Sequence, residues 1–458
     1  MGRYHSPVQV PARVVILVAN PITYDGRVRR HASTLAEAGY DVCVVGVIGP
    51  NDRDEPPLPA PHSDRGDARW RWQRIDRRRG RLGSGLRWLT SAGRQRAAAA
   101  GFGVAQRLVD GGEADLSAAG LNAAGLAQLA GLAVATSAPE LAWAAIAERP
   151  SLIYANDLDT LPAAAWAAWL CRVPFVYDAH EVYVDEHPAL TLTTRQARAR
   201  AEGYFARRAA AVLTVNRLIA EDLRQRYGLP MPTVVRNLPQ GDAAAAVTPP
   251  SQRPLGQAGT LHILYHGAHI GLSQHGVDDL LRALARLAHD RAAPLRLLLT
   301  LRGGLSSSEE LALRRRLEQL AITPQVRLLP PVPGAEALVR AAVVDGADIG
   351  LAVHPPLCLS YVYTTSSKVY EYQLAGLAVV ASDVTGNRHS IAPGAGLFYP
   401  AGDDQRLAAC LRELSLDRGT LRAMQQAAFE YGQRSLRWQD ERNALVAVIE
   451  HALRRGRT

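Results

Sequence analysis

The stretch from 366 to 383 brings together side chains that could hold a phosphorylated ligand. A polar loop reaching Ser367 opens a predicted helix that carries Lys368 and Glu371 in its first turns. A helix N-terminus suits a diphosphate, because its free N–H groups and its dipole both favour anions. Lys368 adds a positive charge there, and Glu371 could accept hydrogen bonds from ribose hydroxyls. The alternative is a surface helix with an ordinary i, i+3 Lys–Glu pair.

Lys368 also stands out in the composition. It is the only lysine among 52 basic residues, the other 51 being arginines. Together with abundant alanine, this bias suggests a GC-rich bacterial genome. The one retained lysine therefore favours a local chemical requirement, with chance retention as the alternative.

A second group of polar side chains follows predicted strands nearer the start of the chain. Asp157-Leu158-Asp159 could hold a metal-bound diphosphate, but it also opens a predicted helix, where aspartate can serve as an N-terminal cap. We expect Asp157 to cap or to contact an acceptor. The acidic and histidine residues between 178 and 187 could form a metal site, yet nothing in their spacing fixes a geometry. We expect the polar rim of a cleft there, and no metal.

The elements that position these groups read as two parallel α/β domains. A chain of 458 residues, 48% of them hydrophobic, is long enough for two cores. Short apolar runs alternate with helix-length segments, a pattern typical of parallel sheets. The predicted strands are 14–19, 42–47, 152–155, 175–177, 212–215, 233–235, 263–265, 295–301, 326–328, 349–353 and 378–381.

The same reading divides the chain into four parts. We expect a first α/β domain over 1–238, a linker over 239–260, a second α/β domain over 261–425 and crossover helices over 426–458. The linker is rich in Ala, Pro, Gly and Gln. The four cysteines show no CxxC spacing, which indicates neither a zinc site nor a disulfide framework and suits a reducing cytoplasm.

One segment, 65–98, is strongly basic. It holds eleven arginines against two aspartates, and Trp70, Trp72 and Trp88 are interleaved with them. Arginine and tryptophan together suit an anionic lipid surface, and a solvated loop is the alternative. No recognition motif accompanies the patch, so we expect no nucleic-acid partner.

The motif around Lys368 resembles the PNK-x-x-EY-x-x-AG-x-PVV-x-SD segment of the retaining GT-B glycosyltransferases. That glycosyltransferase family 4-like group includes bacterial capsule and exopolysaccharide enzymes. The resemblance continues, in order, through 19–21, 24–30, 35–40, 154–162, 176–181, 235–239 and 265–267. It implies a GT-B fold, that is, two Rossmann-like doubly wound domains facing across a cleft with a C-terminal helix crossing back. It also implies that 1–238 is the acceptor-side domain and that 261–425 binds the nucleotide sugar.

The resemblance also implies roles for single residues. Glu371 resembles the second Glu of the family's E-x7-E motif, which holds the donor ribose, and Gly26 matches a glycine that approaches the donor phosphates. His180 lies in the stretch near the acceptor, with a structural histidine as the alternative. We expect catalytic roles for His180, Lys368 and Asp157. The expected donor-binding residues are Gly26, Gly267, His269, His275, Arg302, Ser367, Lys368 and Glu371.

Several positions depart from the family pattern. Tyr363 stands where the first Glu of E-x7-E would be, and Asn156 where many relatives have His. Ala268 and His275 occupy positions where relatives place basic residues that neutralise the donor phosphates. That task would then fall to Lys368, His269 or His275.

The expected function is transfer of a sugar, with retention of configuration, from a nucleotide diphosphate sugar to an acceptor. The acceptor would be a membrane-associated glycan or a lipid-linked intermediate in polysaccharide biosynthesis. We expect no cofactor beyond the donor, and a cytoplasmic enzyme peripheral to the inner membrane face. The alternatives are a nucleotide-sugar epimerase of the same fold and a non-catalytic scaffold with a degenerate donor site.

Overall fold

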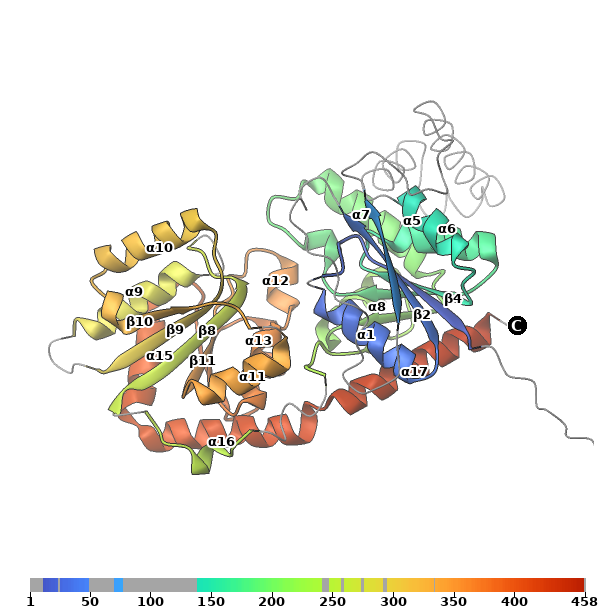
Figure 1. Ribbon diagram of the computed structural model, residues 1–458. Helices are drawn as coiled ribbons and strands as arrows, with labels where there is room; N and C mark the ends of the chain where they lie inside the picture. The colour runs from blue at the N-terminus through green and yellow to red at the C-terminus, as the bar shows by residue number, and fades with distance from the viewer. Residues whose placement is uncertain are drawn as a thin grey trace, which may run out of the picture. The chain divides into compact units, whose positions relative to one another are not determined.

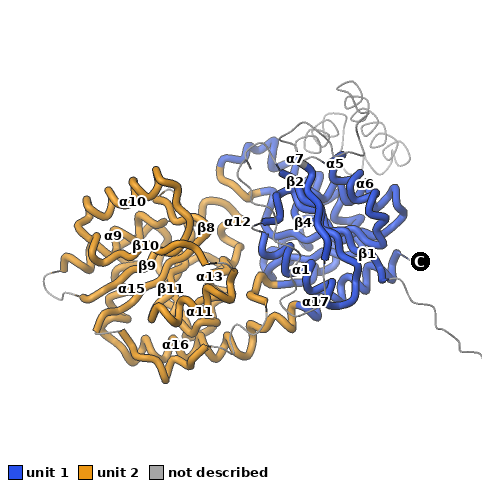
Figure 2. Tube along the Cα trace, in the orientation of Figure 1, with its two compact units in different colours: residues 1–184, 189–235, 442–458 blue, residues 185–188, 236–441 orange. Residues whose placement is uncertain are grey.

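The chain forms two compact units, each built around one parallel sheet (Figures 1 and 2). The computed structural model describes residues 11–23, 25–48, 70–76, 138–240, 247–256, 259–272, 276–290, 295–332 and 334–456. Unit 1 comprises residues 1–184, 189–235 and 442–458, and unit 2 comprises residues 185–188 and 236–441. Apart from the short piece 185–188, the chain enters unit 2 at Arg236 and returns to unit 1 within its last helix.

Unit 1 holds a seven-stranded parallel sheet in the order β3-β2-β1-β4-β5-β6-β7. The strands are β1 (Arg13–Leu17), β2 (Asp41–Ile48), β3 (Arg71–Asp76), β4 (Leu152–Asn156), β5 (Phe175–Ala179), β6 (Ala211–Thr214) and β7 (Thr233–Val234). The central strands are apolar runs, because a parallel sheet is covered by helices on both faces. The strand order reverses between β1 and β4, where an open α/β sheet places its ligand crevice at the carboxyl ends.

Helices cover both faces of this sheet. They are α1 (Gly26–Glu37), α5 (Ala138–Ala147), α6 (Leu161–Cys171), α7 (Leu192–Ala206), α8 (Arg217–Tyr227) and α17 (Trp438–Arg455), with a short 3-10 turn η1 (Tyr183–Asp185). Leu445 and Ile449 of α17 are fully buried against Val14 and Ile16 of β1. The last helix is therefore part of the core of unit 1.

Unit 2 repeats the same plan with six parallel strands in the order β10-β9-β8-β11-β12-β13. The strands are β8 (Leu261–His269), β9 (Leu297–Gly304), β10 (Val326–Leu329), β11 (Ile349–Ala352), β12 (Ala378–Ser382) and β13 (Gly396–Tyr399). The order reverses between β8 and β11. The expectation of two Rossmann-like, doubly wound domains is confirmed.

Two layers of helices enclose the second sheet. The helices are α9 (Val277–Ala288), α10 (Ser307–Gln319), α11 (Ala335–Val344), α12 (Leu359–Tyr363), α13 (Ser367–Leu374), α14 (Thr385–Ser390), α15 (Asp404–Leu416) and α16 (Arg418–Ser435), with 3-10 turns η2 (Pro250–Gln252) and η4 (Thr323–Gln325). Residues of α9, α10 and α15 form one apolar cluster on the sheet, and residues of α11, α13 and α16 form another. Figure 1 shows the two groups on opposite faces of β8, β9 and β11.

Where the structure describes the basic Arg/Trp segment 65–98, the segment forms a strand and not the solvated loop that was the alternative expectation. Residues 71–76 form the edge strand β3, which pairs with β2. Trp70 is buried in the core of unit 1, and its Nε1 donates a hydrogen bond to Oγ of Ser33 at 3.2 Å. Trp70 is therefore a structural residue and not a membrane anchor. The rest of the segment, with Trp88, lies outside the described residues.

Within the described ranges, no helix combines the length and the low charge that crossing a bilayer requires.

Trp70 gives a direct test of the edge strand. Trp70→Ala should lower the free energy of unfolding by about 3–5 kcal/mol, because it removes a large buried ring and leaves a cavity. Trp143→Ala is the matched control, since that ring is 53% exposed on α5 of the same unit. The control should stay within about 0.5 kcal/mol of the wild type in urea unfolding. Equal losses for the two variants would contradict the placement of Trp70.

Candidate active site

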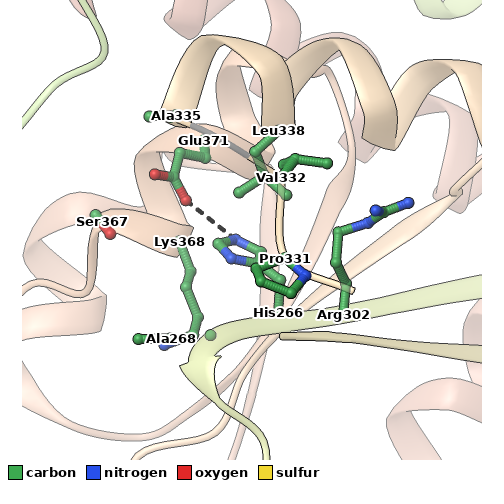
Figure 3. A pocket seen from close by; sticks show the side chains of 12 residues that line it. His266, Ala268, Arg302, Pro331, Val332, Ala335, Leu338, Ser367, Lys368 and Glu371 are labelled. Atoms are coloured by element: carbon green, nitrogen blue, oxygen red, sulfur yellow. Dashed lines mark ion pairs between the residues drawn. The ribbon is translucent and has the colours of Figure 1, made fainter. Parts of the chain in front are cut away.

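A pocket of roughly 230 Å³ opens at the carboxyl edge of the second sheet (Figure 3). Its walls come from the end of β8, from β9, from the loop after β10 and from the starts of α11 and α13. The lining residues are His266, Gly267, Ala268, Arg302, Pro331, Val332, Gly334, Ala335, Leu338, Ser367, Lys368 and Glu371. Five of the expected donor-binding residues, Gly267, Arg302, Ser367, Lys368 and Glu371, therefore meet in one place.

Helix α13 brings Lys368 and Glu371 to this pocket because its other residues are anchored in the core. Val369 and Tyr372 are buried against β11 and β12. The ring of Tyr372 lies directly over Gly350 of β11, where an added Cβ would come within 2.2 Å of Cγ of Tyr372. Only glycine permits this approach, so the helix sits close to the sheet, and Ser367, Lys368 and Glu371 line the pocket.

Glu371 lies against His266, which the sequence analysis did not identify as a site residue. Nε2 of His266 is 3.0 Å from Oε2 of Glu371, and both side chains are almost completely buried. Burial lowers the pKa of His266 below its usual value, with Glu371 opposing the shift and Lys368 and Arg302 adding to it. Oε2 of Glu371 has no aligned hydrogen-bond donor among the described residues. A buried carboxylate oxygen that faces a pocket and lacks an aligned donor can accept a hydrogen bond from a ligand hydroxyl.

Two cationic side chains line the same pocket. Burial lowers the pKa of Lys368, and Glu371 opposes that shift. Arg302 is fixed in place, because its guanidinium donates to Oδ2 of Asp345 at 2.5 Å and to the carbonyl of Pro330 at 3.2 Å. Its Nε is buried and has no hydrogen-bond acceptor among the described residues. The pocket therefore offers a flexible ammonium and a pre-positioned guanidinium to an anion.

One of the two expected histidine ligands, His269, is not part of this pocket. His269 ends β8 but is exposed and does not line the pocket. The pairing of β8 with β9 shifts register between Gly267 and His269, and such an irregularity re-aims the side chains that follow it. The expectation for His269 is therefore not met by its position. His275 lies outside the described residues.

The polar group expected in unit 1 gathers at the carboxyl ends of β4 and β5. Nδ1 of His180 is 2.8 Å from Oδ1 of Asp157, and its Nε2 is 3.1 Å from Oδ2 of Asp178. The hydroxyl of Tyr183 also donates to Oδ1 of Asp157. Burial disfavours the charged imidazole, but Asp157 and Asp178 outweigh it and raise the pKa of His180 to about 10. The histidine is thus a buried cation held between two carboxylates.

Asp178 is the centre of this network, and the sequence analysis assigned it no such role. Arg27 of α1 binds it with two hydrogen bonds of 3.0 and 2.8 Å, and Tyr154 of β4 donates to it at 2.6 Å. Burial raises its pKa, but Arg27 and His180 outweigh this and hold the pKa well below its usual value. Burial, with Arg27 next, lowers the pKa of neighbouring His31 well below its usual value. Arg27 and His31 are four residues apart and therefore share a helix face. This spacing was the signal in the sequence that could have pointed to the network.

Asp157 does not cap α6, although capping was one of the two roles expected of it. The N-cap of α6 is Thr160, and Asp157 has a positive φ of 69° and directs its carboxylate to His180 and Tyr183. Gly26 begins α1, where Asp25 is the N-cap and accepts a hydrogen bond from the N–H of Val28. Gly26 therefore lies at a helix N-terminus, and its role near the donor phosphates stays a prediction. Within the described ranges, no group of three His, Cys, Asp or Glu side chains is arranged to hold a metal ion.

Two Rossmann-like units, with polar groups at the carboxyl edges of both sheets, define the class of GT-B glycosyltransferases. The family models agree. Residues 25–239 match the model described as "Glycosyl transferase 4-like domain", and residues 260–417 match "Glycosyl transferases group 1". The chain therefore belongs to the GT-B glycosyltransferases, in the group with a family 4-like first domain, and it is a glycosyltransferase.

Solved structures show the same fold. Sucrose-phosphate synthase from Thermosynechococcus elongatus is 16% identical, with a TM-score of 0.60 over 97% of this chain and 100% of that one. The Anabaena protein HepE, solved in complex with UDP-glucose, is 15% identical, with a TM-score of 0.62 over 96% and 99%. Trehalose 6-phosphate synthase from Burkholderia multivorans is 14% identical, with a TM-score of 0.58 over 98% and 97%. Comparison with curated protein sequences gave no match.

The pairing of His180 with Asp157 and Asp178 has a measurable consequence. His180 should remain an imidazolium at pH 8, whereas buried His31 in the same network should remain neutral, and NMR of the imidazole nitrogens distinguishes the two forms. Asp157→Asn should lower the pKa of His180, because one of its two carboxylates is gone. Since the folded pKa is raised to about 10, the ion pairs stabilise the fold fully below about pH 6.5 and progressively less from there to about pH 10. A neutral His180 at pH 8 would contradict its pairing with the two carboxylates.

Proposed function

We propose that this glycosyltransferase takes its sugar from a nucleotide diphosphate donor bound in the pocket of unit 2. The observation that carries the proposal is the meeting of Lys368, Arg302 and the His266–Glu371 pair at the carboxyl edge of the second sheet. The two cations suit a diphosphate, and the Glu371 carboxylate suits the ribose hydroxyls. A nucleotide diphosphate sugar uses both features, whereas a neutral saccharide has no anionic group for the two cations to neutralise.

Arg302 offers a substitute for the basic residue that relatives carry where this chain has Ala268. Its guanidinium reaches the pocket from β9 and is held by Asp345 and the carbonyl of Pro330. The unsatisfied Nε supplies a donor that does not have to break an existing bond to meet a phosphate oxygen. The altered phosphate-binding positions are thereby compatible with an active donor site.

UDP is the nucleotide that we propose first. HepE, which shares the fold, was solved with UDP-glucose and with UDP and glucose. The likeness is in fold only, so the base and the sugar of the donor are part of the proposal.

The reaction that we propose is direct transfer with retention of configuration. The bond between the anomeric carbon and the diphosphate oxygen breaks, a bond to the acceptor oxygen forms, and the acceptor proton passes to the departing diphosphate. Lys368 would stabilise the charge that develops on that leaving group. His180, a cation whose two ring nitrogens face the carboxylates of Asp157 and Asp178, would hold these carboxylates in place near the acceptor and would not act as a general base. The proposal uses no metal ion, because Lys368 and Arg302 supply the neutralising charge.

We further propose that the acceptor is a membrane-associated glycan or lipid-linked intermediate, handled by unit 1 at the cytoplasmic face of an anionic membrane. The support is the charge of segment 65–98, eleven arginines against two aspartates. Removal of 65–81 as a block is no longer a clean test, since it would delete β3 and Trp70. Neutralising Arg77, Arg78, Arg79 and Arg81 with glutamine leaves the edge strand in place.

Glu371→Gln tests the donor site. The variant should bind UDP about tenfold or more weakly, because a charge-assisted hydrogen bond to a ribose hydroxyl is worth roughly 1.5–3 kcal/mol. Isothermal titration with UDP measures the affinity, and a thermal-shift series with UDP, GDP, ADP and their sugars identifies the base. Glu318→Gln, an exposed substitution of the same kind on α10, is the control. Wild-type affinity in a folded Glu371→Gln protein would remove Glu371 from the site.

Lys368→Arg tests the role of the single lysine. Arginine keeps the charge but brings a broad planar group into a pocket already occupied by Arg302, so the variant should fold and lose much of its turnover. Lys368→Met removes the charge and should lose on the order of 10²–10³ in rate, as when one oxyanion donor is removed. Release of UDP from UDP-sugar in the presence of acceptor measures turnover, and NMR of the product gives its anomeric configuration. A Lys368→Arg enzyme with the wild-type rate would show that the lysine has no special role.

A further inference from the structure

Unit 1 contains a second cavity, at the edge of its sheet opposite to the polar network. Its volume is roughly 500 Å³, and it lies where β5 and β6 begin and where α6, α7 and α17 end (these helices are labelled in Figure 1). Four arginines line it, Arg172, Arg207, Arg208 and Arg455, and all four are exposed. None of the described residues that line the cavity is acidic.

The arginines come from three separate stretches of chain that the fold fixes together. Gly456, just after α17, lies so close to Pro174 that an added Cβ would be 2.5 Å from Cδ of that proline. A guanidinium nitrogen of Arg455 donates to the carbonyl of Ala210 at 3.3 Å, and one of Arg207 donates to the carbonyl of Tyr227 at 3.3 Å. The cavity is thus part of the folded unit and not a chance gap between mobile side chains.

Helix capping alone does not account for this much positive charge. Arg172 and Arg207 are the C-caps of α6 and α7, and Arg455 is the last residue of α17. Each helix C-terminus carries about −0.5 of an elementary charge, so three of them contribute only about −1.5 against four guanidinium groups. The described lining of the cavity therefore carries more positive charge than the three helix ends offset.

The rim of the cavity is apolar as well as basic. Trp169, which lines it, is 52% exposed, and the adjacent Leu170 is 49% exposed. Tryptophan beside arginine is typical of surfaces that meet the headgroup region of a bilayer, where the ring lies among the headgroups and guanidinium groups meet phosphates. A soluble phosphate would use the arginines but would leave Trp169 and Leu170 in water.

We propose that this cavity, here called the arginine cavity, binds the phosphate of an anionic phospholipid, with Trp169 and Leu170 inserted at the headgroup level. The lining residues belong neither to the donor pocket nor to segment 65–98, and the inference deepens the proposed membrane contact by placing it on defined residues. Donor binding does not depend on it. UDP affinity therefore reports on the proposed function, and vesicle binding reports on this inference.

The test uses the full chain with vesicles of phosphatidylcholine, with and without about one third phosphatidylglycerol. Binding should require phosphatidylglycerol and should weaken between 50 and 500 mM salt, because exposed charges are screened over roughly 10 Å at 0.1 M. Arg172→Gln/Arg207→Gln should bind about 25-fold more weakly, since an arginine near an anionic surface is worth roughly fivefold. Arg217→Gln/Arg224→Gln removes the same charge from α8 of the same unit and should change binding much less.

Two further variants separate the remaining explanations. Trp169→Ala keeps every charge and both caps, and it should still weaken vesicle binding severalfold, so the inference stays testable if the double arginine variant is unstable. The glutamine variant of Arg77, Arg78, Arg79 and Arg81 measures the contribution of segment 65–98 independently.

Several outcomes would overturn the proposal. Equal losses in the cavity and control variants would show a non-specific charge effect. A lowered melting temperature with unchanged vesicle binding would reduce the arginines to helix caps. Thermal stabilisation by glycerol 3-phosphate that the cavity variant loses, with vesicle binding unaffected, would assign the site to a soluble phosphate.

Discussion

Parallel pairing of every strand is the constraint on which both sites depend. In a parallel sheet all carboxyl ends lie at one edge, and each strand must be followed by a crossover that begins there. In unit 2 this brings the end of β8, the end of β9 and the start of α13 to one pocket. In unit 1 it brings Asp157, Asp178 and His180 from β4 and β5 to the start of α1. Residues far apart in sequence meet because all strands of a parallel sheet end at the same edge.

The two edges handle charge in opposite ways. In unit 1, burial of Asp178 is made tolerable by Arg27, and the same carboxylate then fixes His180 as a cation. The charged groups of this network are paired with one another, although Nε2 of His180 also lacks an aligned hydrogen-bond partner among the described residues. In unit 2, Glu371, His266 and Arg302 retain polar atoms without aligned partners in the described structure. Unsatisfied buried groups are costly, so a ligand that completes them gains affinity from the fold itself.

The sequence was sufficient for the architecture but only in part for the sites. The apolar runs predicted the central strands of both sheets, because buried parallel strands have apolar residues on both faces. Strand β3 was missed because it is an edge strand, in which arginines interrupt the apolar pattern. Lys368 and Glu371 were found from a local motif. His266 was missed because a histidine inside an apolar run is typical of a core position. His269 was expected among the donor-binding residues but does not line the pocket, and the register shift in β8 that precedes it cannot be recognised from residue types.

The route of α17 has a consequence for the order in which the protein can be assembled. Leu445 and Ile449 complete the core of unit 1, yet they follow the whole of residues 236–441 in the chain. At about 5–20 residues per second, a ribosome needs roughly 10–40 s to make that stretch. During this time the first sheet lacks the helix that seals one of its faces, and exposed apolar strands are open to aggregation or chaperone capture. Unit 2, whose residues from 236 onward are contiguous, can fold first although it is made second.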